Sequence, residues 1–122
     1  MSMPLSNAPH FDWATYTHAV ERTAGQGPTD TDPRRLANFG MGLAGEAGEV
    51  CDALKKVVFH DHPLDKDKLI EELGDVLWYV AALAATIDVP LEVIARRNAK
   101  KLEERYPAGF DPLRSRNRPP TP

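Results

Sequence analysis

Four carboxylates form two pairs in which the acids are three residues apart. Glu46 and Glu49 make up the first pair, and Glu72 and Asp75 make up the second. The surrounding residues repeat too, since leucine, glutamate, glycine, an acid and valine occur at the same relative places in both segments. At about 100° per residue, each pair lies one helical turn apart at the border of an apolar stripe. We therefore expect all four acids at the rim of a helical core.

Carboxylates in such a place need a counter-charge, because they repel one another and lose hydration. Oxygen ligands without cysteine or histidine at matching spacing favour a hard cation, Mg²⁺ or alternatively Mn²⁺, over zinc. We predict a metal site formed by these four acids. Two other interpretations are a solvated acidic face without a metal and a di-iron site. The di-iron site ranks lower, because His60 and His62 do not stand in the usual Glu-x-x-His register.

Other polar side chains lie at spacings that could bring them to the same site. Tyr79 lies one turn beyond Asp75 and could contact a base or a phosphate, although a tyrosine at a core rim shows the same pattern. Asn98, Lys101 and Arg105 share one helical face through spacings of three and four. Facing the carboxylates, this strip could hold phosphate oxygens. The alternative is a solvated face whose cations pair with nearby glutamates.

The elements that must position these residues are helices. Apolar residues recur at helical spacing, and no run of β-branched residues with a period of two occurs. Asp12 and Asp32 are expected N-caps, and Pro33 suits the first helical position. Four helices are expected, at residues 11–23, 33–59, 65–88 (starting at Asp65 or Asp67) and 90–106. Their short links predict an all-α fold of the four-helix bundle type.

Length and proline distribution predict one domain with a tail at each end. The chain has 122 residues, of which 42% are hydrophobic and 27% charged, as in a folded protein. Seven of the eleven prolines lie near the two ends. Residues 1–10 are therefore expected to be a flexible N-terminal tail, and residues 107–122 an extended, Pro/Arg-rich C-terminal tail. Residues 11–106 would form a single domain with a modest core, which we expect homo-oligomerisation to complete.

Composition excludes or disfavours several classes of protein. Cys51 is the single cysteine, so no intrachain disulfide can form. The longest apolar run, residues 76–87, is too short to span a bilayer, and residues 1–10 lack the features of a signal peptide. We therefore expect a cytoplasmic protein without a membrane partner. The net charge of −3 weighs against nucleic acid as a partner.

Three sequence strings resemble the MazG-like nucleoside triphosphate pyrophosphohydrolases, which belong to the all-α NTP pyrophosphatase superfamily. They are GLAGEAGEV at residues 42–50, EELGDVLWY at residues 71–79 and NxxKLxxRYP at residues 98–107. The resemblance spans residues 11–107 and is strongest from residue 42 onward. Either acid pair alone would be a weak signal, whereas the three strings together are quite specific.

The resemblance implies both a fold and an activity. The fold would be a helical bundle completed as a homodimer or homotetramer. The activity would be Mg²⁺-dependent hydrolysis of a nucleoside triphosphate between its α and β phosphates, giving a monophosphate and pyrophosphate, with nucleotide-pool house-cleaning as the role. The family's Mg²⁺ ligands correspond to Glu46, Glu49, Glu72 and Asp75, and its substrate contacts to Tyr79, Asn98, Lys101 and Arg105.

The catalytic residues expected from both lines of reasoning are Glu49 and Glu46. Mg²⁺ would bridge the carboxylates and the phosphates, and Glu49 is the first choice for orienting or deprotonating the attacking water. Lys101 and Arg105 would steady the pyrophosphate as negative charge develops on it. Gly45 stands where dUTPase-like members have a further glutamate, so a base at that position is missing. The alternative to an enzyme is a non-catalytic helical binding or assembly module.

Overall fold

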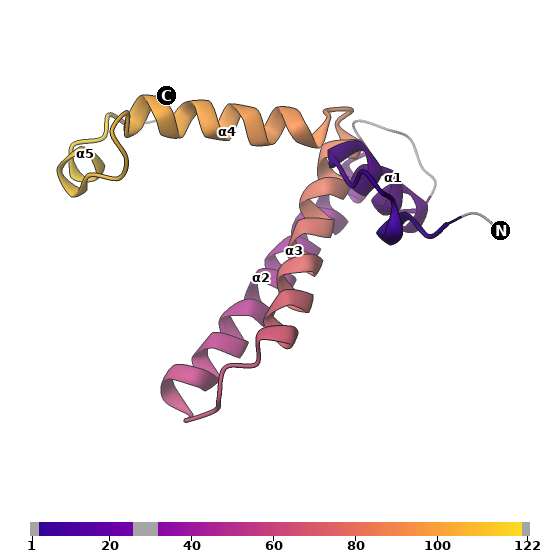
Figure 1. Ribbon diagram of the computed structural model, residues 1–122, viewed down its shortest axis with the longest axis horizontal. Coiled ribbons are helices and arrows are strands. Elements are labelled where there is room, and N and C mark those ends of the chain that lie inside the picture. The colour runs from indigo at the N-terminus through magenta and orange to yellow at the C-terminus, as the bar shows by residue number, and fades with distance from the viewer. Residues whose placement is uncertain (1–2, 26–31, 121–122) are drawn as a thin grey trace. The chain divides into compact units, whose positions relative to one another are not determined.

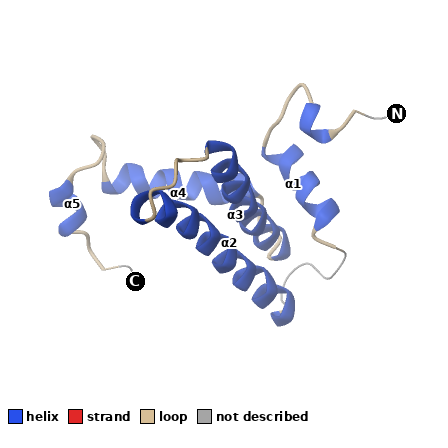
Figure 2. Ribbon diagram, turned by 90° about the horizontal axis from the view of Figure 1, so that it is seen from below, coloured by secondary structure: helices blue, strands red, loops and turns tan. Residues whose placement is uncertain are grey.

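The computed structural model describes residues 3–25 and 32–120, and within them the chain is all-helical without a β-strand (Figure 1; Figure 2). This confirms the all-α class expected from the sequence. A short 3-10 helix, η1, lies within the expected N-terminal tail. The described elements are η1 (Leu5–Asn7), α1 (Trp13–Thr23), α2 (Pro33–Phe59), α3 (Lys66–Thr86), α4 (Leu91–Arg105) and α5 (Pro112–Arg116).

Aspartate caps set the starts of the first three α-helices. Side-chain oxygens of Asp12, Asp32 and Asp65 accept hydrogen bonds from backbone N–H groups in the first turns of α1, α2 and α3, at 2.8, 3.0 and 3.0 Å. Pro33 follows at the start of α2, where its missing N–H forfeits no hydrogen bond. The predicted caps of α1 and α2 are confirmed, and Asp65 rather than Asp67 begins the third helix.

Several helix boundaries differ from the sequence-based expectation by one or two residues, since α1 begins at Trp13 instead of residue 11 and α4 spans Leu91–Arg105 instead of residues 90–106. α3 ends at Thr86, two residues before the expected Asp88, because Asp88 has a left-handed φ of 55° that a right-handed helix cannot contain. The segment 107–122 is not extended throughout, since it contains α5. Asp111 caps α5 and Pro112 occupies its first turn. This is the same Asp-Pro signal that starts α2, so the prolines of this segment mark a helix start as well as extended chain.

The chain divides into two compact units, Met1–Leu91 and Glu92–Pro122. The division falls at the start of α4, inside the expected domain of residues 11–106, and that domain boundary stays a prediction. In the first unit α2 and α3 form an antiparallel helical hairpin, and α1 packs against α3 (Figure 1). The second unit contains α4 beyond its first residue, α5 and the residues that follow.

The core of the first unit lies where α1, the first half of α2 and the second half of α3 meet. Val20 of α1 and Phe39 of α2 pack there with three alanines of α3 and with Leu91. Phe39 lies edge-on to Trp78, with ring centroids 5.7 Å apart. The indole N–H of Trp78 donates to the hydroxyl oxygen of Thr23 at 2.8 Å. The Phe39–Trp78 contact fixes α2 against α3 and so helps to set the register of the two acid pairs, whereas the Trp78–Thr23 hydrogen bond fixes α1 against α3.

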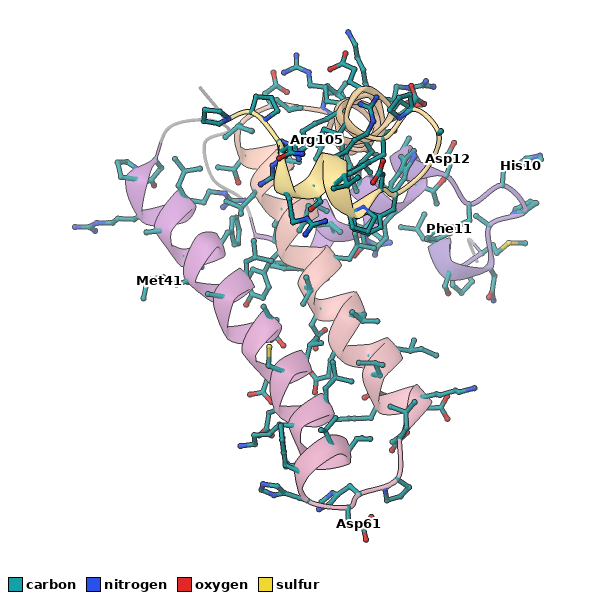
Figure 3. The ribbon with its side chains drawn as sticks, turned by 90° about the vertical axis from the view of Figure 1, so that its left-hand side faces the viewer. His10, Phe11, Asp12, Met41, Asp61 and Arg105 are labelled. Carbon is teal, nitrogen blue, oxygen red and sulfur yellow. The ribbon has the colours of Figure 1, made fainter. Side chains whose placement is uncertain are left out.

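Part of the apolar surface of the hairpin is uncovered. Ile70, Leu73 and Leu77 are 65%, 51% and 40% exposed, and their spacing of three and four residues places them on one face of α3. We term these three residues the α3 stripe. Met41 is likewise exposed and points away from α3 (Figure 3). A contiguous apolar stripe of this kind is typical of a surface that packs against another one.

No single helix in the described part of the chain is long and apolar enough to cross a membrane. The helices α3 and α4 taken together are long and apolar enough to pass for a broken membrane span. Buried core helices of other proteins are equally long and apolar, so this is weak evidence for a span.

Candidate metal centre

The α2–α3 hairpin brings three of the four predicted acids together. Glu46 of α2 and Glu72 and Asp75 of α3 each offer one carboxylate oxygen, and these oxygens lie within 4.8 Å of one another. Their matched helical positions explain this, because both pairs border the same edge of the interface between the helices. Glu49 is not part of the group; it is exposed and lines a neighbouring groove. Glu46, Glu72 and Asp75 are termed the acid cluster below.

The acid cluster has a buried end and an open end. Glu72 is only 6% exposed, Glu46 is half-buried and Asp75 is exposed. A carboxylate held away from water is unfavourable unless a positive charge or a hydrogen bond compensates it. Solvent and dissolved ions can reach the cluster at Asp75, so the arrangement suits a site that exchanges a ligand.

The charges within the acid cluster make Glu46 harder to ionise. Loss of hydration is the largest cause that raises the pKa of Glu46, followed by the negative charges of Asp75, Glu72 and Glu49. The positive charge of Lys68 acts in the opposite direction without cancelling this effect. The cluster therefore keeps an excess of negative charge, which a bound cation would relieve.

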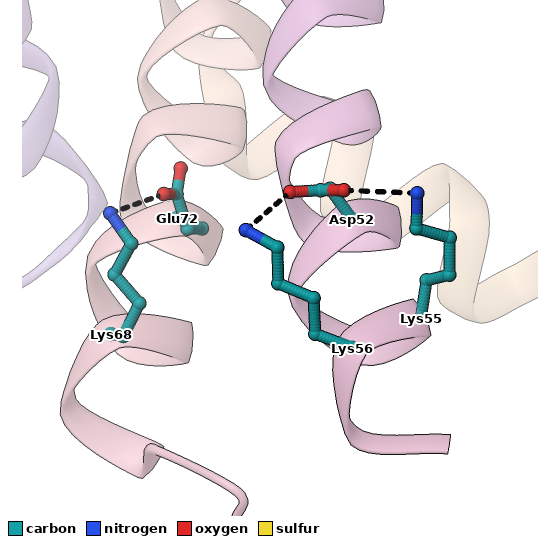
Figure 4. A network of polar contacts seen from close by, with 5 residues as sticks. All are labelled: Asp52, Lys55, Lys56, Lys68 and Glu72. Carbon is teal, nitrogen blue, oxygen red and sulfur yellow. Dashed lines mark ion pairs between the residues drawn. The ribbon is translucent and has the colours of Figure 1, made fainter. Parts of the chain in front are cut away.

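Lys68 supplies one positive charge to the cluster (Figure 4). Its Nζ lies 2.9 Å from Oε1 of Glu72, one turn farther along α3. The hydrogen bond with Glu72 raises the pKa of Lys68, so this lysine is charged at neutral pH. The sequence reasoning missed this residue, although a lysine and a glutamate four residues apart on a helix commonly pair. One lysine does not balance three carboxylates.

A groove of about 340 Å³ lies beside the acid cluster, toward the link between α2 and α3. Glu49 and Lys56 of α2, Lys68 and Glu72 of α3 and His62 of the link are among its lining residues. Figure 4 shows two of these lining residues in ion pairs, Lys56 with Asp52 on α2 and Lys68 with Glu72 on α3. Glu49 therefore faces the same groove as Glu72 without joining the three-oxygen group.

An aromatic hollow of about 310 Å³ lies on the other side of the cluster, toward the end of α3. It is lined by Glu46, Asp75, Trp78 and Tyr79. The Tyr79 ring crosses α2 at Gly42 so closely that a Cβ on this glycine would overlap the ring atoms. It also lies edge-on to Trp78, with centroids 4.9 Å apart. Tyr79 is thus fixed as a wall next to the acids, and its predicted contact with a nucleotide stays a prediction.

Helix α1 brings a further residue near the acids. Burial, followed by the negative charge of Asp75, raises the pKa of Tyr16, which places this phenol within electrostatic reach of the open end of the cluster. Tyr16 was not among the predicted site residues. No periodicity relates residue 16 to residue 75, so only the packing of α1 on α3 reveals the proximity.

The acid cluster fits a divalent cation by donor type and by spacing. All three donors are carboxylate oxygens, the ligands that Mg²⁺ and Mn²⁺ prefer. Two oxygens on one octahedral Mg²⁺ are about 3 Å apart when adjacent and about 4.2 Å apart when opposite, given bonds of about 2.1 Å. Oxygens within 4.8 Å of one another reach these separations through small side-chain rotations. The cluster can therefore hold a metal, and the identity of the metal stays a prediction.

The polar strip predicted to face the acids lies in the second unit. Asn98 and Lys101 are exposed on α4, and Arg105 at its end is half-buried. The three share one face of the helix, as their spacing requires. Their approach to the carboxylates of the first unit stays a prediction.

Comparison with known proteins gives two matches. The family described as the MazG nucleotide pyrophosphohydrolase domain matches residues 36–110, which include the acid cluster, Glu49 and the polar strip. The "Gene 37 protein" of Mycobacterium phage L5 is similar to this chain, with 44% identity over 78 residues that cover 61% of this chain and 68% of the phage protein. No solved structure matches the chain significantly.

Proposed function

Because this chain belongs to the MazG nucleotide pyrophosphohydrolase domain family, we propose that it hydrolyses nucleoside triphosphates between the α and β phosphates. The products are a nucleoside monophosphate and pyrophosphate, and the role is house-cleaning of the nucleotide pool. The observation that carries the proposal is the acid cluster. Three carboxylates from two helices converge within the matched region, and they retain a negative excess that one lysine does not cancel.

The proposed cofactor is Mg²⁺, with Mn²⁺ as the alternative. Glu46, Glu72 and Asp75 would hold it, and Glu49 is the fourth candidate ligand at the edge of the site. The chemistry that such a cation supplies is neutralisation of the phosphate charge and acidification of a water molecule. The buried Glu72 forms the inner end of the site, and Lys68, which pairs with it, would compete with the cation there.

Glu49 is the proposed general base. It stands outside the three-oxygen group and lines the groove beside it, so its carboxylate is free to orient or deprotonate the attacking water. Glu46 is the second candidate, because its raised pKa brings it closer to the range in which a carboxylate exchanges protons near neutral pH. Either residue acts from α2, across the site from Glu72 and Asp75.

The substrate would be bound from two sides. The walls of the aromatic hollow, Trp78 and Tyr79, offer faces and edges on which a nucleobase can pack. Asn98, Lys101 and Arg105 would bind phosphate oxygens, and the two cations would stabilise the leaving pyrophosphate. The assignment of Asn98, Lys101 and Arg105 rests on the family and on the helical face that they share.

We propose further that the enzyme is a cytoplasmic homo-oligomer, a dimer or a tetramer. The fully buried side chains of the first unit are mostly small, while the α3 stripe is uncovered. A second copy packed on that stripe would bury the missing apolar surface and complete a helical bundle.

Product analysis tests the reaction. The purified protein is incubated with Mg²⁺ and a panel of standard and modified nucleoside and deoxynucleoside triphosphates, and the products are separated. We expect monophosphate and pyrophosphate, and we expect Glu49→Ala to lose nearly all turnover while keeping its fold. Diphosphate and phosphate would contradict the cleavage site. Wild-type rates in Glu49→Ala would contradict the assigned base.

The ion pair between Lys68 and Glu72 favours a second candidate, a non-catalytic helical binding or assembly module. In that case Lys68 compensates the buried Glu72, water solvates the exposed Asp75 at the open end, and no metal is bound. The same experiment separates the two functions, because the module turns over no nucleotide and gains no thermal stability from Mg²⁺ and nucleotide together.

A further inference from the structure

The two units of the chain carry opposite charge. Residues 92–122 contain eight lysines and arginines and four aspartates and glutamates, a formal charge of +4. Residues 1–91 contain seven basic and fourteen acidic residues, a formal charge of −7. The net charge of −3 therefore conceals a basic unit that attracts anions.

Four of these cations line one pocket of about 570 Å³. Lys101 and Arg105 come from the last turns of α4, whereas Arg114 and Arg118 come from α5 and the residues after it. Among the residues that the structure describes, none of the four forms an ion pair. The acidic residue in the lining, Glu104, lies 4.0 Å from a lysine outside the pocket. Four cations and one carboxylate therefore line the pocket, which leaves it with an excess of positive charge.

An ordered turn places the two arginines of the later segment in this pocket. Gly109 has a left-handed φ of 92°, which favours glycine, and its N–H donates to the carbonyl oxygen of Tyr106 at 2.9 Å. The rings of Tyr106 and Phe110 pack with centroids 5.3 Å apart. Asp111 then starts α5 by accepting a hydrogen bond of 2.9 Å from its first turn. The chain returns to α4 through defined contacts.

We propose that this pocket binds the phosphate chain of a polyphosphate, namely inorganic pyrophosphate or the triphosphate of a nucleotide, and that Arg114 and Arg118 are binding residues. One guanidinium group can donate two parallel hydrogen bonds to the oxygens of a phosphate. Four cations around one space also match the several negative charges of a polyphosphate. The proposal rests on the proposed function for Lys101 and Arg105. It extends the substrate contacts to a segment beyond residues 36–110, the part that matches the family.

The shape of the pocket favours a small polyphosphate over a nucleic acid. The cations surround a single space, and Leu113, Pro119 and Pro120 form an apolar part of its wall. Proteins that bind single strands use an extended basic groove with aromatic side chains on which successive bases stack. The described lining of this pocket includes no aromatic side chain.

Calorimetric titration of inorganic pyrophosphate into the full chain, in metal-free buffer, tests the proposal. Arg114→Gln and Arg118→Gln each remove a pocket cation, and Arg116→Gln removes a cation of α5 that does not line the pocket. We expect each pocket variant to bind pyrophosphate about tenfold more weakly, and the control to stay within about twofold of the wild type. Equal weakening in all three variants would show only a general basic surface and would overturn the proposal.

Two further outcomes would also overturn it. The first is a folded wild-type protein that does not bind pyrophosphate. The second is displacement of pyrophosphate by a short single-stranded oligonucleotide that binds more tightly, which would assign the pocket to nucleic acid.

Turnover assays distinguish this proposal from the proposed function. If the protein shows no turnover but its pyrophosphate affinity depends on Arg114 and Arg118, the pocket proposal stands and the proposed function is contradicted. If turnover is normal but pyrophosphate affinity is unchanged in both variants, the proposed function stands and the pocket proposal is contradicted. Where turnover occurs, pyrophosphate inhibition that is competitive with nucleotide and weaker in the variants identifies the substrate's own phosphate site. Non-competitive inhibition identifies a separate site for free pyrophosphate.

Discussion

Loss of hydration and repulsion from the neighbouring carboxylates raise the pKa of Glu46. Protein stability should therefore depend on pH through this residue. The folded chain binds the Glu46 proton more tightly than the unfolded chain does. Its contribution to stability is therefore fully present below the ordinary value of 4.5 and is lost as the pH rises through the raised pKa. We expect Glu46→Gln to raise the melting temperature at pH 7 without metal, and to lose this advantage near pH 4. Thermal unfolding at both pH values, followed by circular dichroism, measures the difference.

Glu71→Gln is the matched control for this experiment, because Glu71 is exposed and lies outside the acid cluster. An equal gain in the Glu71 and Glu46 variants would attribute the effect to net charge alone. Added Mg²⁺ should raise the melting temperature of the wild type and of Glu71→Gln more than that of Glu46→Gln, because binding to the folded state stabilises it.

Lys68 competes with a cation for the acid cluster, so its removal should separate stability from metal binding. Lys68→Met leaves the buried Glu72 without its partner at 2.9 Å, and we expect a lower melting temperature without metal. The cluster then carries one more uncompensated negative charge, so Mg²⁺ should bind more tightly and stabilise the variant more than the wild type. Titration of Mg²⁺ against melting temperature measures both effects. Weaker Mg²⁺ binding in Lys68→Met would show that the lysine supports the metal site rather than competing for it.

At the scale of the elements, the close approach of the Tyr79 ring to α2 requires a glycine at position 42. A Cβ at Gly42 would overlap the Tyr79 ring, whereas a Cβ at Gly45 meets no atom within 4 Å. We expect Gly42→Ala to destabilise the protein by about 1–3 kcal/mol through overpacking. Gly45→Ala should be neutral, or stabilising by up to about 1 kcal/mol, because alanine favours a helix more than glycine does. Urea unfolding measures both, and equal effects would contradict the close approach of Tyr79.

The local part of this architecture could be predicted from the sequence. Caps and periodicity are properties of neighbouring residues, so Asp32-Pro33 located the start of α2 correctly. The matched helical positions also predicted that Glu46 would meet Glu72 and Asp75. The Asp111-Pro112 start of α5 is the same kind of local signal. It is hard to distinguish from extended chain because prolines are abundant in that segment.

What could not be predicted depends on how the helices pack. Residues three apart on a helix are also separated by about 4.5 Å along its axis, and Glu49 lies farther along α2, toward the link to α3, where it lines the groove instead of joining the three-oxygen group. The proximity of Tyr16 to Asp75 arises from two helices far apart in the sequence. No pattern within either helix contains that information.

At the scale of the whole molecule, the α3 stripe should be the contact between copies. Leu73 is 51% exposed at the centre of the stripe, and an aspartate there would place a charge in an apolar interface. We expect the wild type to behave as a dimer or tetramer in size-exclusion chromatography with light scattering, and Leu73→Asp to behave as a folded species of lower mass. Met41→Asp, on the face of α2 turned away from α3 (Figure 3), is the comparison. Dissociation by Met41→Asp alone would place the interface on that other face.

The central claim, that the acid cluster performs metal-dependent cleavage of a nucleoside triphosphate, is tested most directly by comparing two exposed acids of α3. Asp75 belongs to the cluster and Glu71 does not, and Asp75→Asn and Glu71→Gln make the same change of charge. The measurement is the rate of monophosphate and pyrophosphate formation at increasing Mg²⁺ concentration. We expect Glu71→Gln to match the wild type and Asp75→Asn to lose at least about 100-fold in rate at low Mg²⁺. Equal rates in two folded variants, or wild-type rates that do not depend on Mg²⁺, would contradict the claim.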